Sequence, residues 1–162
     1  MSIQEIWRIL QTIIVICGIG FGSVTQTVAD QTDPRLNDLF DRLQDVTLPA
    51  DVVSTERQIW TIWLEPTDAA TQQLLKDGMQ SMSRGEYQAA LKAFDQLVAL
   101  APEFAEGWNK RATLHYLMDN LDRSLEDIAR TLELEPRHFG ALSGRGACLC
   151  QDGRPGTGAD RI

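Results

Sequence analysis

The feature of this sequence that most constrains its fold is an internal repeat with a period of 34 residues. Residues 71–104 align with residues 105–138 without a gap, and residues 139–154 begin a third copy. Several equivalent positions carry the same residue: Lys76 and Lys110, Leu91 and Leu125, Leu100 and Leu134, Pro102 and Pro136. A fixed period of this length indicates a stack of similar units, each of which buries its apolar face against its neighbours.

Apolar residues within each copy recur at the spacing of two amphipathic helices. This spacing predicts helices near residues 71–83, 87–99, 105–118, 121–134 and 138–150. Small residues at Gly78 and Ala90 would let paired helix backbones approach closely, and Gly85 permits the turn between them. Pro102 ends the second helix. The predicted fold class is all-α, an α-solenoid of helix–turn–helix units.

The period and the residue pattern together resemble the tetratricopeptide-repeat (TPR) family, in particular small exported bacterial TPR-containing proteins. The resemblance implies that the first helices of successive units line a concave groove, which holds a peptide or helix of a partner protein. It implies an interaction scaffold rather than an enzyme. The groove positions that it implies are Leu75, Met79, Met82, Glu106, Asn109, Thr113, Tyr116, Leu117 and Ser143.

The residues at these positions refine the expected groove. Its first part is apolar, and methionines adapt to partners of different shape. The alternative is that the preceding segment already covers Leu75, Met79 and Met82. Some family members clamp a partner's C-terminal carboxylate with basic groove residues. Here Lys110 is the single basic residue at the matching positions, so we do not expect that mode; the other matching positions carry Leu75, Met79, Gly140 and Gly144.

The segment before the repeats, residues 30–70, does not fit the 34-residue register. It predicts two helices, the first starting at Asp33 and the second covering about residues 51–64. We interpret this pair as a helical hairpin that caps the open end of the stack, because repeat arrays need to cover their end faces. Trp60 and Trp63 either pack in this cap or form an aromatic binding platform, and packing is the favoured interpretation.

Residues 1–29 have the pattern of a secretory signal peptide. Arg8 precedes an apolar run from Ile9 to Phe21, and small or neutral residues then lead to Ala29. The run is short for a membrane span, which needs about 20 residues. We therefore expect cleavage after Ala29 and a periplasmic, exported protein; an uncleaved inner-membrane anchor is the alternative.

The third copy departs from the pattern after its first helix. Pro155 stands where the second helix should carry a large apolar residue, and residues 155–162 are predicted to be a disordered tail. Two explanations stay open. Either the coding sequence is truncated or shifted in frame here, or another chain supplies the missing helix and the protein is a self-associating subunit.

Charge and residue chemistry argue against several function classes. The net charge of −8 disfavours nucleic-acid binding, which needs a basic face. His115 and His138 are predicted to pack rather than to catalyse, and no convergent catalytic set or metal-ligand spacing is present. Cys148 and Cys150 point in different directions on a helix, so they do not pair with each other. We expect no cofactor, metal or small-molecule substrate, and a membrane tether only if the leader stays attached.

Overall fold

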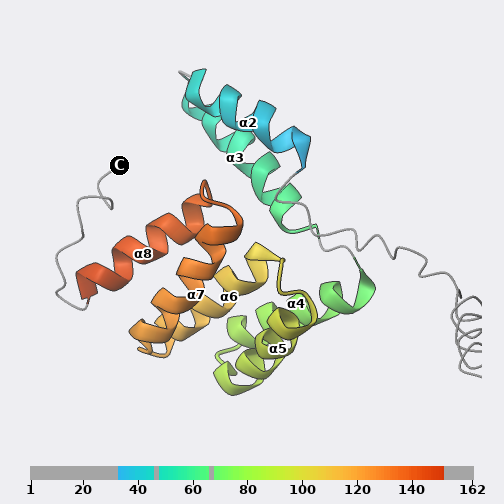
Figure 1. Ribbon diagram of the computed structural model, residues 1–162, viewed down its shortest axis with the longest axis vertical. Helices are drawn as coiled ribbons and strands as arrows, with labels where there is room; N and C mark the ends of the chain where they lie inside the picture. The colour runs from blue at the N-terminus through green and yellow to red at the C-terminus, as the bar shows by residue number, and fades with distance from the viewer. Residues whose placement is uncertain (1–32, 46–47, 66–67, 152–162) are drawn as a thin grey trace, which may run out of the picture.

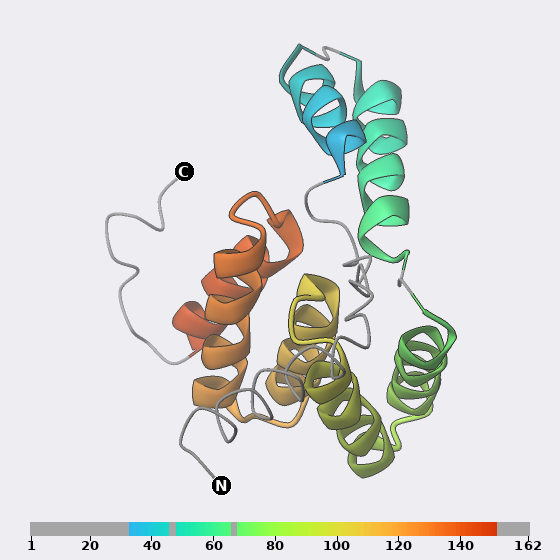
Figure 2. The same ribbon diagram turned by 45° about the vertical axis from the view of Figure 1, so that its right-hand side comes forward.

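The computed structural model describes residues 33–45, 48–65 and 68–151, which form seven helices and no strand (Figure 1). The helices are α2 (Pro34–Asp45), α3 (Pro49–Trp63), α4 (Ala69–Ser83), α5 (Tyr87–Leu100), α6 (Ala105–Leu117), α7 (Leu121–Leu134) and α8 (Phe139–Gln151). Helices α4 to α8 stack one against the next, and the α2–α3 hairpin stands apart from this stack in both views (Figures 1 and 2). The all-α prediction is confirmed. The predicted leader and tail lie outside the described residues.

The first unit, α4 and α5, is fixed by a cap, a turn and a close approach. The Asp68 carboxylate accepts the backbone N–H groups of Ala70 and Thr71 at 2.9 Å, which starts α4 two residues before the expected position. Gly85 has φ of +76°, a left-handed conformation that glycine adopts without strain. Gly78 lies against the Phe94 ring so closely that an added Cβ would overlap it. The small residue is therefore required where the two helices meet.

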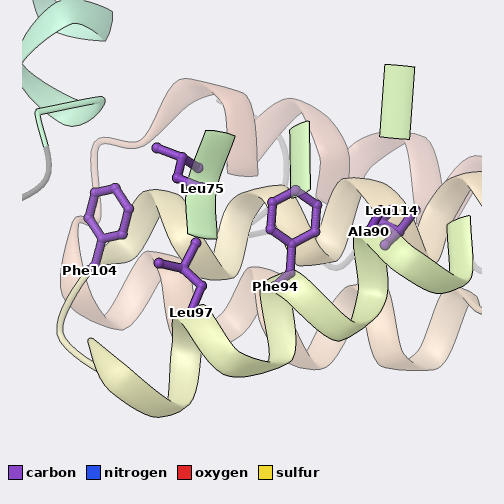
Figure 3. Packing of buried hydrophobic residues seen from close by; sticks show 6 residues of the cluster. All are labelled: Leu75, Ala90, Phe94, Leu97, Phe104 and Leu114. Carbon is purple, nitrogen blue, oxygen red and sulfur yellow. The ribbon is translucent and has the colours of Figure 1, made fainter. Parts of the chain in front are cut away.

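A core of buried side chains joins the first unit to the second (Figure 3). It consists of Leu75, Ala90, Phe94, Leu97, Phe104 and Leu114. Phe104 is the last residue of the first copy and directly precedes α6, and Leu114 comes from the next copy, so each unit completes the core of its neighbour.

The second unit, α6 and α7, repeats this design with different chemistry. The buried hydroxyl of Ser124 donates a 2.9 Å hydrogen bond to the carbonyl of Ala112, which holds the two helices together at the position equivalent to Ala90. Asp119 occupies the turn with φ of +60°, a conformation that short polar side chains tolerate better than most. Ala141 and Cys148 of α8 close the next core against this unit.

The guanidinium group of Arg111 links three helices of the stack. Its guanidinium donates to Asp127 of α7 through Nε at 2.8 Å and Nη2 at 2.7 Å, and to Asp95 of α5 through Nη1 at 2.8 Å. Asp127 is buried, so this bidentate pair replaces the water that the carboxylate loses on folding. The pair holds α6 against its neighbours on both sides.

The α2–α3 hairpin forms as expected, with its own core of Leu36, Leu39, Ile59 and Ile62. Its position differs from the prediction. Instead of capping the outer face of the first unit, it packs through Trp60 and Trp63 on His138 and Phe139, where α7 ends and α8 begins. The two indole rings pack on two aromatic rings there, and among the described residues of this segment Leu64 packs against the core of the first unit.

None of the described helices is both long enough and apolar enough to cross a bilayer. Helix α3 begins at Pro49, two residues before the expected position, because proline suits the first turn of a helix.

Candidate partner-binding groove

A hollow of about 140 Å³ lies between the first helices of the second and third units, α6 and α8. It is lined by Asn109, Ala112, Thr113, Tyr116, Ser124, Ile128, Gly140, Ser143, Gly144 and Ala147. All of these side chains are uncharged. Hydroxyl and amide groups stand around small residues and the apolar Ile128, so the hollow offers both hydrogen bonds and apolar contact to an uncharged segment of another molecule.

The repeat register explains why these residues meet. Asn109 and Ser143 are 34 positions apart, as are Thr113 and Ala147, so equivalent positions of successive units lie side by side. Four positions assigned to the groove from the sequence line the hollow: Asn109, Thr113, Tyr116 and Ser143. The Thr113 hydroxyl already donates to the carbonyl of Asn109 at 2.9 Å, which leaves its oxygen lone pairs as acceptors.

The other assigned positions lie elsewhere. Leu75 is buried in the core between the first two units, and Met82 packs against that core. Met79 is 37% exposed and borders a separate hollow of about 510 Å³ on α4, together with Leu75 and Leu64. Leu117 is exposed near the end of α6 and does not line the α6–α8 hollow. Leu64, from the end of the hairpin, therefore covers part of the apolar surface that the first helix would otherwise present.

Glu106 requires a correction, because the structure buries it completely instead of presenting it to a partner. Its carboxylate accepts a hydrogen bond from Asn109 Nδ2 at 2.9 Å, lies 3.0 Å from His138 Nε2 and pairs with Lys110 Nζ at 2.7 Å. Burial alone would raise the pKa of Glu106, but the hydrogen bond from His138 and the charge of Lys110 outweigh it and hold the pKa below its usual value. The side chain is therefore an ionised structural centre.

The hydrogen-bond network assigns the His138 tautomer. Its Nδ1 accepts the backbone N–H of Ala141 at 3.2 Å, so the ring proton sits on Nε2 and points at Glu106. Lys110 is likewise engaged, between Glu106 and the Trp60 ring, whose centroid lies 5.4 Å from Nζ. The one basic residue at the matching clamp positions is thus committed within the chain.

A second polar hollow, of about 250 Å³, lies between α5, α6 and α7 around Arg111. His115 lines it, and burial lowers the pKa of this imidazole despite the attraction of Asp127. Its Nδ1 is buried and has no hydrogen-bond partner among the described residues. Within the ranges that the structure describes, no group of three or more potential ligand side chains is arranged to hold a metal ion.

Comparison with known proteins shows which repeat proteins this chain is similar to. No family model matches the chain. A TPR repeat-containing protein of Rhizobium etli is 38% identical over 119 residues, which are 74% of this chain and 58% of the relative. The chain carries tetratricopeptide repeats. Helices α4 and α5 lie in the first copy of the 34-residue repeat, α6 and α7 lie in the second, and α8 lies in the partial third copy.

Two further similarities agree with the TPR assignment. A tetratricopeptide repeat and J domain-containing co-chaperone of Cryptococcus neoformans is 26% identical over 67% of the chain, which spans 20% of that relative. The TPR2B domain of yeast Sti1, solved in complex with pHsp70, superposes with a TM-score of 0.51 at 18% identity and shares the fold. That match covers 52% of this chain and 68% of the yeast chain.

No pattern in the sequence indicates the Glu106–His138 pair. The equivalent positions one repeat earlier are Gln72 and Phe104, so the pair does not recur. A comparison between repeats identifies only what the copies share, and this contact is particular to the second unit.

Proposed function

We propose that this TPR protein is a protein–protein interaction scaffold that binds a peptide or helix of a partner in the concave face between α6 and α8. The observation that carries the proposal is the uncharged hollow formed by Asn109, Thr113, Tyr116 and Ser143. Its TPR relatives and the TPR domain of Sti1, solved with a bound pHsp70 ligand, support the same class of function.

The lining of the hollow defines the chemistry of the partner. A volume of about 140 Å³ suits one aliphatic side chain, and the exposed hydroxyl of Ser143 suits the backbone beside it. No basic side chain lines the hollow, and Lys110 forms an ion pair with Glu106. We therefore expect an internal, uncharged segment of the partner rather than a C-terminal carboxylate.

The proposal extends to location and to the absence of catalysis. The leader pattern of residues 1–29 supports a periplasmic or envelope partner. We also propose that the chain acts by binding alone, since its relatives are repeat proteins and the polar residues of the hollow are arranged as hydrogen-bonding groups.

Affinity capture from envelope extract with a matched pair of variants tests the groove. Ser143→Glu places a charge in the hollow, whereas Leu142→Glu places the same charge on the neighbouring exposed residue of α8, outside the hollow. We expect Ser143→Glu to lose the partners that the wild type retains, and Leu142→Glu to keep them. Equal recovery by Ser143→Glu and the wild type would show that this hollow is not the binding site.

A second candidate function rests on the outer side of α8. Leu142 is 37% exposed and Cys150 is exposed on this helix, against which the described residues place no following helix. A self-associating subunit would use this face. Light scattering on the purified chain distinguishes the two functions, because self-association predicts a dimer or larger species that Leu142→Glu dissociates.

A further inference from the structure

The contact between the hairpin and the repeats is a small, well-formed aromatic site. The Trp63 ring stacks on the His138 ring with centroids 4.2 Å apart and planes 9° from parallel. Trp60 meets the His138 and Phe139 rings edge-on, at 5.5 Å and 5.1 Å. Both tryptophans come from one face of α3, three positions apart, which is the spacing of neighbours on a helix surface.

The repeat side of this docking site is preorganised. Glu106 pairs with His138 on one side and with Lys110 on the other, and both contacts lie within the repeats, so neither needs the tryptophans. Gly140 provides the space for Trp60: an added Cβ at this position would lie 2.8 Å from Cη2 of the indole. The docking site thus consists of Lys110, His138, Phe139 and Gly140, and its shape and cation suit flat aromatic faces.

The hairpin is a separable and imperfect occupant of this site. Its core of Leu36, Leu39, Ile59 and Ile62 lies between its own two helices, and it stands away from the stack (Figure 2). Trp63 Nε1 is buried and has no acceptor among the described residues, which weakens the docked state because the indole N–H loses its water on docking. Arg137 adds a second link at this end, because it donates a 2.9 Å hydrogen bond to Asn37 and its guanidinium lies 4.3 Å from the centroid of the Phe40 ring.

We propose that the docking site is a receptor for a partner helix that carries two aromatic residues three positions apart, and that the α2–α3 hairpin occupies it in cis. A partner helix of this kind displaces the hairpin, and because Gly140 also lines the α6–α8 hollow, displacement uncovers the adjoining end of the groove. The hairpin itself shows which chemistry the site accepts. This receptor goes beyond the proposed groove function, and its test needs no groove partner.

Binding of a labelled synthetic peptide of residues 33–65 to the full chain tests the proposal. In the wild type the site is occupied, so the peptide competes with a tethered copy at high effective concentration. In the double variant Trp60→Ala/Trp63→Ala the site is vacant, and we expect the peptide to bind at least about tenfold more tightly. A peptide with alanine at both tryptophan positions is the control and should bind neither protein. Equal affinity for both proteins, or no binding to the double variant, would overturn the proposal.

A matched pair of glycine variants tests the docking site from the repeat side. Gly140→Ala intrudes on Trp60, whereas Gly144→Ala, one turn further along α8, places its Cβ an ordinary 3.5 Å from Ile128. By amide hydrogen exchange on the full chain, we expect Gly140→Ala to accelerate exchange in α3 while α4 to α7 keep their protection, and Gly144→Ala to leave α3 unchanged. If the double tryptophan variant does not fold, hydrogen exchange in the two glycine variants is sufficient to test the proposal. Unchanged α3 exchange in Gly140→Ala would exclude a displaceable hairpin, and a dimer of the wild type by light scattering would assign the site to the hairpin of a second copy instead.

Discussion

Three glycines in helical positions give a graded test of how tightly the repeat units pack. An alanine at Gly78 would place its Cβ 2.6 Å from Cδ1 and 2.8 Å from Cζ of Phe94, a fully buried ring. At Gly107 the nearest atoms, on Phe104 and Leu97, are 3.2 to 3.4 Å away. At Gly146 no atom lies within 4 Å. The three positions therefore differ mainly in the space available for one methyl group.

Two opposing effects set the expected free energies of unfolding. Alanine in place of a helical glycine stabilises by about 0.5–1 kcal/mol, and forcing a methyl group into a packed core costs about 1–3 kcal/mol. Gly146→Ala should show the gain alone, and Gly107→Ala should change stability little. Gly78→Ala should lose about 1–2 kcal/mol net, because the buried Phe94 ring has no space to move into.

Urea unfolding followed by circular dichroism at constant pH measures this series. Gly146→Ala should be the most stable protein, the wild type and Gly107→Ala should follow with similar stability, and Gly78→Ala should be the least stable. The dependence of the unfolding free energy on urea concentration should be the same for all four. A Gly78→Ala variant as stable as Gly146→Ala would refute the reasoning, since it would mean that α4 and α5 do not approach as closely as Phe94 requires.

Three further predictions concern buried charge. Glu106→Gln should cost about 1.5–3 kcal/mol in urea unfolding, because His138 and Lys110 lose their anionic partner; an unchanged midpoint would contradict the ionised state of this carboxylate. Arg111→Ala should cost about 2–3 kcal/mol because Asp127 stays buried without a cation, whereas Arg130→Ala, which breaks exposed pairs, should cost less than about 1 kcal/mol. Stability should fall as the pH drops below the usual histidine pKa of about 6.5, because the lowered pKa of buried His115 means that the unfolded chain binds the proton more readily. His115→Gln should flatten this slope, and an equally steep slope in the variant would assign the effect to another group.

The repeat made much of the fold predictable. Equivalent positions of the copies carry a small residue at Gly78, a turn residue at Gly85 and a proline at Pro102. In the structure Gly78 lies where two helices meet, Gly85 forms the turn between them, and Pro102 follows the end of α5. The groove positions Asn109 and Ser143 followed from the resemblance to the TPR family, and the structure brings both to the α6–α8 hollow because equivalent residues of stacked units lie side by side. A local pattern combined with a fixed period therefore defines both the helices and the surface they share.

The contacts that sequence reasoning missed are those that occur only once. The resemblance places Glu106 in the groove, but the structure buries it against His138, which has no equivalent histidine in the first unit. The placement of the hairpin depends on Trp60 and Trp63 meeting a surface more than 70 residues further along the chain. Neither periodicity nor helix propensity reports on such non-repeating, long-range packing.

The long sequence separation of the hairpin contact has a consequence for how the chain reaches its native state. The hydrogen bond between Arg137 and Asn37 joins residues 100 positions apart, whereas each TPR unit is built from contacts between neighbouring helices. Closing so long a loop carries an entropic cost that local contacts do not, and non-local contacts slow folding. During synthesis α3 leaves the ribosome long before His138. Its two indole rings therefore stay exposed to water until the residues that bury them have been synthesised.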